Sequence, residues 1–278
     1  MAKLTKSLVR RRSWKIAITL AAILIFAGID YVYGMSLRNP KFLNGWVLLV
    51  GMVFLTLLNF RKKLSVLPIG NADTWVQFHI YVGFFTVYAF LTHVRLSLPA
   101  APLEWVMWIL FWVVALSGVL GAYLSRFWPG RLEQHGERIL FERIPVFRAQ
   151  LAREAESLAM ASVQDAASMT ISNFYLETLH EFFQRPRNMI AHLRSSARPV
   201  SRLTEELEKL ERYVDPPQRE TLHSIRDLVL AKDNLDYQYA QQGALKIWLF
   251  LHIPATYSLI LLSLFHVGLV YAFSSGAP

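Results

Sequence analysis

The chain has 278 residues, 54% of them hydrophobic, and a formal net charge of +9. It contains no cysteine, which excludes disulfides, covalent c-type haem attachment, cysteine-ligated iron–sulfur clusters and thiol catalysis. Residues 127–244 hold 15 of the 29 Lys/Arg and 17 of the 20 Asp/Glu. The rest of the chain therefore holds 14 Lys/Arg and 3 Asp/Glu. Because this positive excess flanks apolar segments, it indicates membrane topology and lipid headgroups, and we expect no nucleic-acid binding.

Apolar runs predict an all-α membrane protein with five transmembrane helices. A basic arm, residues 1–15, precedes the first run. No A-x-A-like cleavage site follows that run, so we expect it to be retained as an anchor and not removed as a signal peptide. The five runs cover residues 16–33, 43–60, 75–98, 104–125 and 245–273, and the prolines of 99–102 are expected to end the third.

A polar segment, residues 127–244, separates the fourth and fifth runs. Apolar residues recur there at three- and four-residue spacing within 147–169 and 201–214, which predicts a helical soluble insert of three or four helices. The predicted division is therefore membrane helices 1–4 in 1–126, the insert in 127–244, and membrane helix 5 in 245–278. No nucleotide-binding or zinc motif occurs in the insert, so we expect a docking or oligomerisation role for it.

The basic residues also predict an orientation. The N-terminal arm and the 61–74 loop carry nine Lys/Arg, whereas the 34–42 and 95–104 loops carry three. The positive-inside rule then places the N-terminus in the cytoplasm. Five crossings place the insert in the cytoplasm and the C-terminus in the periplasm, in a bacterial cytoplasmic (inner) membrane.

The third and fifth runs each carry two histidines, 14 residues apart: His79 and His93, then His252 and His266. At this spacing both rings lie within roughly 40° on one helix face, about 21 Å apart along the axis. The predicted topology makes the two helices parallel, so His79 pairs with His252 on the cytoplasmic side and His93 with His266 on the outer side. Two stacked imidazole pairs are typical of a di-haem cytochrome, with two haem b groups bound within a four-helix-type bundle.

Several other residues are candidates for supporting roles. Arg95, two positions after His93, could pair with haem propionates, or could be an interfacial arginine that sets topology. Gly83, one turn after His79, could leave space for a porphyrin, although ordinary helix packing also explains it. Gly118 is expected to permit close approach of a neighbouring helix or a flat ligand. The remaining histidines have no repeated spacing and are expected to be packing or surface residues: His135, His180, His192 and His223.

With the motifs FHIYVGFFTVYAFLTH (78–93) and LHIPATYSLILLSLFH (251–266), the chain resembles the di-haem membrane cytochromes b. The likeness is closest to the transmembrane core of ferric reductases and NADPH oxidases, and looser to the cytochrome b561 and quinol cytochrome b groups. It covers only the predicted membrane part. The chain departs from this pattern in lacking a sixth helix and a C-terminal flavin or nicotinamide domain, so we do not expect it to oxidise NADPH directly.

These features predict an electron-transfer subunit of a membrane oxidoreductase complex, which carries electrons between a quinone pool and a partner redox protein. The expected partners are a multihaem cytochrome c, an iron–sulfur protein or a dehydrogenase. Quinone is a further expected cofactor, although no named residues mark its binding site. The sequence also allows a homo-oligomer. One alternative is a stand-alone ferric-type reductase. Another is a non-redox scaffold or sensor, in which the insert is the working part and the histidines only join helices by hydrogen bonds.

Overall fold

The computed structural model describes residues 2–36, 39–63, 71–134, 139–161, 169–194, 196 and 198–273. Regular secondary structure in these residues is entirely helical, and five of their helices are long and apolar enough to cross a membrane. The predicted all-α class is therefore confirmed for these residues, and the length and composition of the five helices indicate a multi-pass membrane protein. The chain divides into two compact units, a membrane unit (Met1–Tyr123 with Leu249–Pro278) and an insert unit (Leu124–Trp248).

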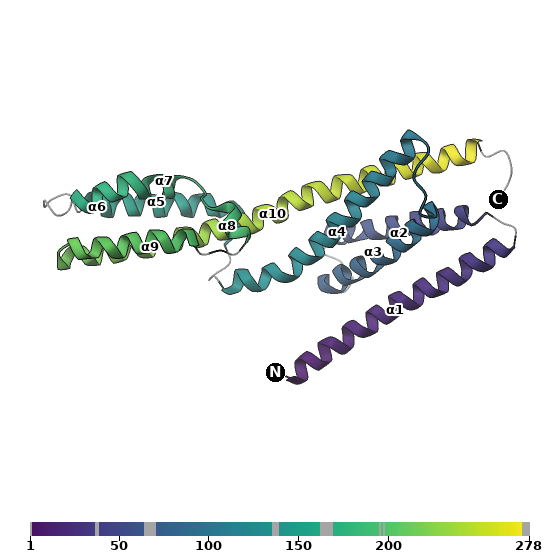
Figure 1. The fold of residues 1–278 in the computed structure, drawn as a ribbon, viewed down its shortest axis with the longest axis horizontal. Coiled ribbons are helices and arrows are strands. Elements are labelled where there is room, and N and C mark those ends of the chain that lie inside the picture. Colours follow the sequence, from purple (N-terminus) through teal and green to yellow (C-terminus); the bar gives the residue numbers. More distant parts are fainter. Residues whose placement is uncertain are drawn as a thin grey trace. The chain divides into compact units, whose positions relative to one another are not determined.

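All of the helices of the membrane unit except the third are longer than the apolar runs alone predict. The N-terminal basic arm is itself helical, because its lysines, arginines and leucines favour helix and no Gly or Pro interrupts them. The last helix begins at Pro216 and continues through Pro254 as one element (Figure 1). The elements are α1 (Ala2–Met35), α2 (Pro40–Lys63), α3 (Ala72–Val94), the first part of α4 (Pro102–Gln134) and the last part of α10 (Pro216–Phe273).

Helix α3 ends at Val94, before the prolines that were expected to end it. The next two residues, Arg95 and Leu96, adopt left-handed backbone conformations with φ of 51° and 54°. This conformation cannot continue a right-handed helix, and it commonly terminates one. The sequence did not reveal this, since glycine or asparagine is the usual residue at such a position.

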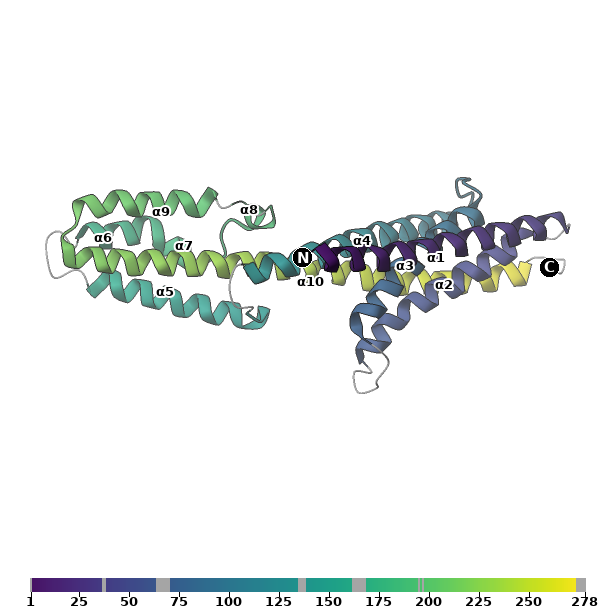
Figure 2. The same ribbon diagram turned by 90° about the horizontal axis from the view of Figure 1, so that it is seen from below.

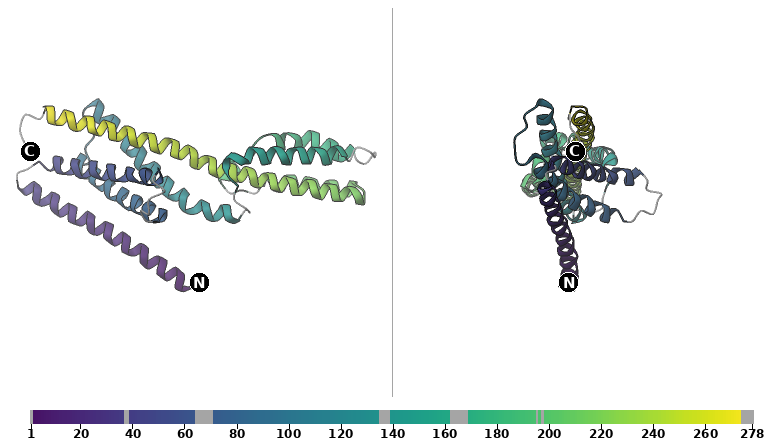
Figure 3. Two further views of the ribbon diagram at one scale, coloured as in Figure 1. Left: turned by 180° about the vertical axis from the view of Figure 1, so that it is seen from behind. Right: turned by 90° about the vertical axis from the view of Figure 1, so that its right-hand side faces the viewer.

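Within the membrane unit, α2 and α3 lie side by side (Figures 1 and 3). Gly51 permits this close approach, because a Cβ there would lie 2.9 Å from Oγ1 of Thr86. On another side of α3, Phe90 stacks on Phe111 of α4, with ring centroids 3.7 Å apart and planes inclined by 10°. Leu259 of α10 joins the same apolar core. This apolar core therefore packs α3 against α4 and α10. Helix α10 carries the other two paired histidines.

The insert unit is a helical bundle around the first part of α10. Figure 2 shows α5 and α9 running alongside the green part of that helix. A π-helical turn, η4, links α6 to α7 without a break. The elements are η1 (Phe141–Arg143), α5 (Ile144–Ala161), α6 (Met169–Phe174), η4 (Tyr175–Leu179), α7 (His180–Gln184), α8 (Met189–Leu193), α9 (Arg198–Leu210) and η5 (Glu211–Tyr213).

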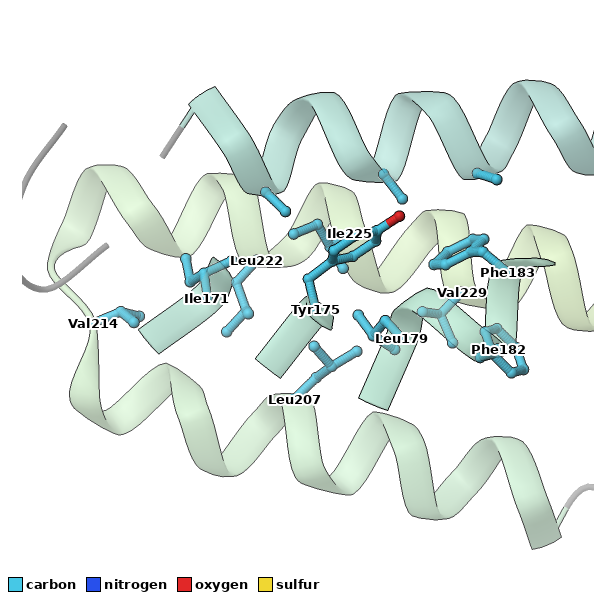
Figure 4. Close-up of a cluster of buried hydrophobic side chains, with 13 residues drawn as sticks. Ile171, Tyr175, Leu179, Phe182, Phe183, Leu207, Val214, Leu222, Ile225 and Val229 are labelled. Atoms are coloured by element: carbon cyan, nitrogen blue, oxygen red, sulfur yellow. The ribbon is translucent and has the colours of Figure 1, made fainter. Parts of the chain in front are cut away.

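The core of the insert unit gathers side chains from α5, the α6–α7 run, α9 and α10 (Figure 4). Tyr175, Leu179 and Phe183 follow one another at four-residue spacing, and each is at most 1% exposed. Ile225 and Val229 of α10 face them with the same spacing and burial. Four-residue spacing keeps each set on one helix face, so both helices bury a continuous apolar stripe.

One ion pair is buried in this unit. The side chains of Lys232 and Asp236 are 0% and 1% exposed, and Nζ lies 2.6 Å from Oδ2. Lys232 also donates to the carbonyl of Arg185 at 3.0 Å and lies 3.9 Å from the ring centroid of Phe182. The amide of Arg187 donates to Oδ2 of Asp236 at 2.9 Å. These extra partners offset the loss of water around both charges, and they tie the loop after α7 to α10.

Replacing Phe183 with alanine is expected to destabilise the insert unit by about 3–5 kcal/mol, because the deleted ring leaves a cavity in a packed core. Pulse proteolysis of the full chain in detergent measures this loss. Leu176→Ala is the matched control, since Leu176 is 52% exposed and its truncation should cost less than about 0.5 kcal/mol. Similar losses for both variants would show that the assignment of the core is wrong.

Replacing Lys232 with methionine is expected to cost about 3–5 kcal/mol in the same assay, since it leaves the Asp236 carboxylate buried without its cation. The double variant Lys232→Met/Asp236→Leu removes both charges and should regain most of this loss. A double variant no more stable than Lys232→Met would contradict the account of a compensated pair.

Candidate functional site

The structure brings His79 of α3 and His252 of α10 together. Their ring centroids are 6.4 Å apart and their planes are inclined by 67°. Two imidazoles that bind one metal ion from opposite sides have metal–nitrogen bonds of about 2 Å each. With two ring radii of about 1.2 Å, this gives a centroid separation of about 6–6.5 Å. The observed separation falls within this range.

The other two histidines, His93 of α3 and His266 of α10, line one cavity of about 510 Å³. This volume lies in the range of about 300–1,000 Å³ typical of small-molecule and cofactor sites. Its walls come from α2, α3, α4 and α10 and are mainly apolar, with Met52, Phe90, Met107, Trp108 and Leu259 among them. The few polar side chains on the wall include Lys41, Glu104 and Ser263.

Helix α2 holds the rings of His79 and His93 through hydrogen bonds at Nδ1. Nδ1 of His79 lies 3.1 Å from the carbonyl oxygen of Leu55, and Nδ1 of His93 lies 3.1 Å from that of Lys41. A carbonyl can only accept a hydrogen bond, so in both rings Nδ1 carries the proton and Nε2 carries the lone pair. This is the tautomer in which a histidine binds a metal through Nε2.

His252 binds a hydroxyl group through Nδ1. Oγ of Ser117 lies 2.9 Å from the carbonyl oxygen of Val114 and 2.8 Å from Nδ1 of His252. A hydroxyl can donate or accept, so this hydrogen bond orients the ring without assigning its proton. Metal-binding histidines are commonly oriented by such a hydrogen bond at their second nitrogen.

Two glycines make room for the rings. A Cβ at Gly45 would lie 3.0 Å from Cε1 of His93, and one at Gly118 would lie 3.6 Å from Cε1 of His252. Gly118 was predicted to permit close approach of a helix or a flat ligand, but its histidine neighbour was not predicted. Gly45 and Ser117 were not predicted to belong to the site. These residues lie on helices without spaced histidines, so no one-dimensional pattern connects them to the site.

The structure places the two supporting candidates in different surroundings. Arg95 is exposed at the end of α3 and, although described, is not among the residues that line the cavity. Lys41, whose carbonyl binds His93, lines it instead. No atom lies within 4 Å of the position that a Cβ would take at Gly83, so the space beside it is open, one helical turn from His79.

The remaining described histidines lie in the insert unit, apart from these pairs. His192 is 3% exposed and its Nε2 lies 3.5 Å from Oδ1 of Asp233. Nε2 of the more exposed His223 lies 3.6 Å from Oε1 of Glu211. His135 lies outside the described residues. In the part of the chain that is described, no group of three or more His, Asp or Glu side chains is arranged to hold a metal ion.

Comparisons with protein-family models, with curated proteins and with solved structures find no match for this chain. A functional proposal therefore depends on the geometry of the histidine pairs and of the cavity.

Replacing Gly45 with alanine is expected to destabilise the membrane unit by about 1–3 kcal/mol, because the new methyl group would displace the ring of His93. Gly28→Ala on α1 is the control: no atom lies within 4 Å of its Cβ position, and alanine favours helix over glycine by about 1 kcal/mol. Thermal unfolding of the full chain in detergent compares the two. A Gly45→Ala variant as stable as Gly28→Ala would contradict this packing.

Proposed function

We propose that the chain is a di-haem cytochrome b subunit that carries electrons across a bacterial cytoplasmic membrane. The observation that carries the proposal is the separation of the His79 and His252 rings, which matches two imidazoles on opposite sides of one iron. His93 and His266, which line the cavity, are the second pair of ligands in this proposal. Bound between these pairs, haem would supply one-electron transfer at two depths of the bilayer.

The residues present fit a b-type haem. The proposed ligands are imidazoles, and the chain has no cysteine for covalent attachment. The cavity has the volume and the apolar walls of a cofactor site. Lys41, on that wall, is a cation suited to pairing with a carboxylate of the ligand.

The chain's own residues prepare the ligand nitrogens. The hydrogen bonds at Nδ1 orient the rings of His79, His93 and His252, and in His79 and His93 they make Nε2 a better electron donor to a metal. The stacked rings of Phe90 and Phe111 form part of the apolar wall beside His93 and limit the access of water. These residues thus fix ring orientation before any cofactor binds.

The remaining parts of the proposal extend the sequence analysis. The distribution of Lys and Arg supports a cytoplasmic N-terminus and insert, and a periplasmic C-terminus. A quinone pool and a partner redox protein would then exchange electrons with the chain at opposite faces of the membrane.

A non-redox scaffold would also use hydrogen bonds between histidines and neighbouring helices. Such bonds to Leu55 and Ser117 do not require His79 and His252 to meet at a metal-bridging distance. The paired arrangement of the rings is the observation that favours the cytochrome over the scaffold.

The purified full chain, expressed with haem available, is expected to show a sharp reduced α band and two haems per polypeptide. His252→Ala and His266→Ala should each lose one haem, whereas His223→Ala on the insert should keep both. Ser117→Ala should weaken haem binding by about 10–100-fold, because His252 loses its orienting partner. Reduced-minus-oxidised spectra and haem content measure these effects, and a colourless protein would refute the proposal.

A further inference from the structure

We call residues 139–147 of the insert unit the juxtamembrane turn. It begins with the two residues before η1 and continues through η1 into the start of α5. Its backbone is held against α10 at Ile139. Oε1 of Gln238 accepts a hydrogen bond from the Ile139 amide at 2.9 Å, and Nε2 of Gln242 donates to its carbonyl at 2.9 Å. Because both backbone polar atoms are engaged, the position of the turn along α10 is fixed.

The next residues of the turn contact Lys246. Its Nζ lies 2.6 Å from Oε1 of Glu142 and 4.0 Å from the ring centroid of Phe141. The hydrogen bond from Lys246 lowers the pKa of Glu142 below its ordinary value, so the Glu142 carboxylate is ionised at neutral pH. Lys246 is also the last charged residue of α10, which carries none from Ile247 to Phe273.

These contacts place the turn at a definite depth. A bilayer is about 40–45 Å thick around a hydrocarbon core of about 30 Å, so each headgroup layer is about 5–8 Å deep. At 1.5 Å per residue, such a layer spans about four or five residues of α10. Lys246 borders the uncharged stretch and therefore lies in this layer, together with the two residues of the turn that touch it.

The turn presents apolar and cationic side chains away from the unit. Leu140 is 66% exposed and Val146 is 57% exposed, and Arg143 between them is also exposed. Ile144 is fully buried, so it packs the turn against the insert unit while Leu140, Arg143 and Val146 stay exposed. Exposed apolar residues beside a positive charge, at headgroup depth, are typical of segments that lie in a membrane interface.

We propose that the juxtamembrane turn is an interfacial anchor that binds an anionic bilayer surface. Leu140 and Val146 enter the boundary between headgroups and acyl chains, and Arg143 contacts lipid phosphate. The charge of Arg143 favours anionic over neutral lipid, although the insert as a whole has more acidic than basic residues. This proposal holds whether or not the histidine pairs bind haem.

The absence of cysteine allows single labels in the full chain, reconstituted in lipid nanodiscs. A fluorophore on Leu140→Cys is expected to be quenched by brominated lipid and shielded from aqueous iodide. Leu176→Cys and Tyr213→Cys are the controls, since these residues are 52% and 76% exposed on other parts of the insert unit. Their labels should be quenched by iodide and not by lipid.

A second comparison tests the charge. Brominated phosphatidylglycerol should quench the Leu140 label more than brominated phosphatidylcholine, and Arg143→Gln should reduce this preference by about fivefold. Arg153→Gln, an exposed arginine further along α5, should leave it unchanged. The proposal is overturned if the Leu140 label responds like the two controls, if neutral and anionic lipid quench it equally, or if it is shielded from iodide without contact with lipid.

Discussion

A ring N–H buried among membrane helices must find an acceptor, because an unsatisfied polar group in hydrocarbon costs several kcal/mol. The histidines of α3 meet that requirement between helices. His79, His93 and His252 each bind a residue of another helix through Nδ1. For His79 and His93, whose partners are carbonyls, one hydrogen bond therefore joins two helices and also determines which nitrogen carries the proton. Helix packing and ligand orientation follow from the same contact.

The depth of the two pairs gives this arrangement its proposed use. Fourteen residues of helix span about 21 Å, which fits within a hydrocarbon core of about 30 Å with one pair towards each face. A single pair would hold a cofactor without connecting the two sides of the membrane. Two pairs on the same two helices provide two positions at different depths, as transfer of electrons across the bilayer requires. The proposed function would account for the repeated spacing on α3 and α10, which isolated helix–helix hydrogen bonds do not require.

The sequence predicted those features that depend on periodicity, and it missed those that depend on contacts. Apolar length identified the five spanning helices, and equal spacing paired His79 with His252 and His93 with His266; the structure brings the first pair into ring contact and places the second pair on one cavity. Gly45 could not be assigned, because its role comes from a ring on another helix.

Boundaries failed for local reasons. The prolines of 99–102 were expected to end the third helix, yet α3 ends earlier, at Val94. Arg95 takes a left-handed conformation that arginine rarely adopts, so no residue preference could have indicated it.

Helix α10 shows why the insert is part of the fold and not an appendage. The same helix contributes Val229 to the core of the insert unit and Leu259 to the core of the membrane unit. Its first part has a buried stripe, which includes Ile225, that packs against α5, α9 and the α6–α7 run. Without those helices this stripe and the Lys232–Asp236 pair would face water, and the first part of α10 would lose the packing that stabilises most helices in proteins. The element that carries two of the four paired histidines therefore depends on the insert for the stability of its first part.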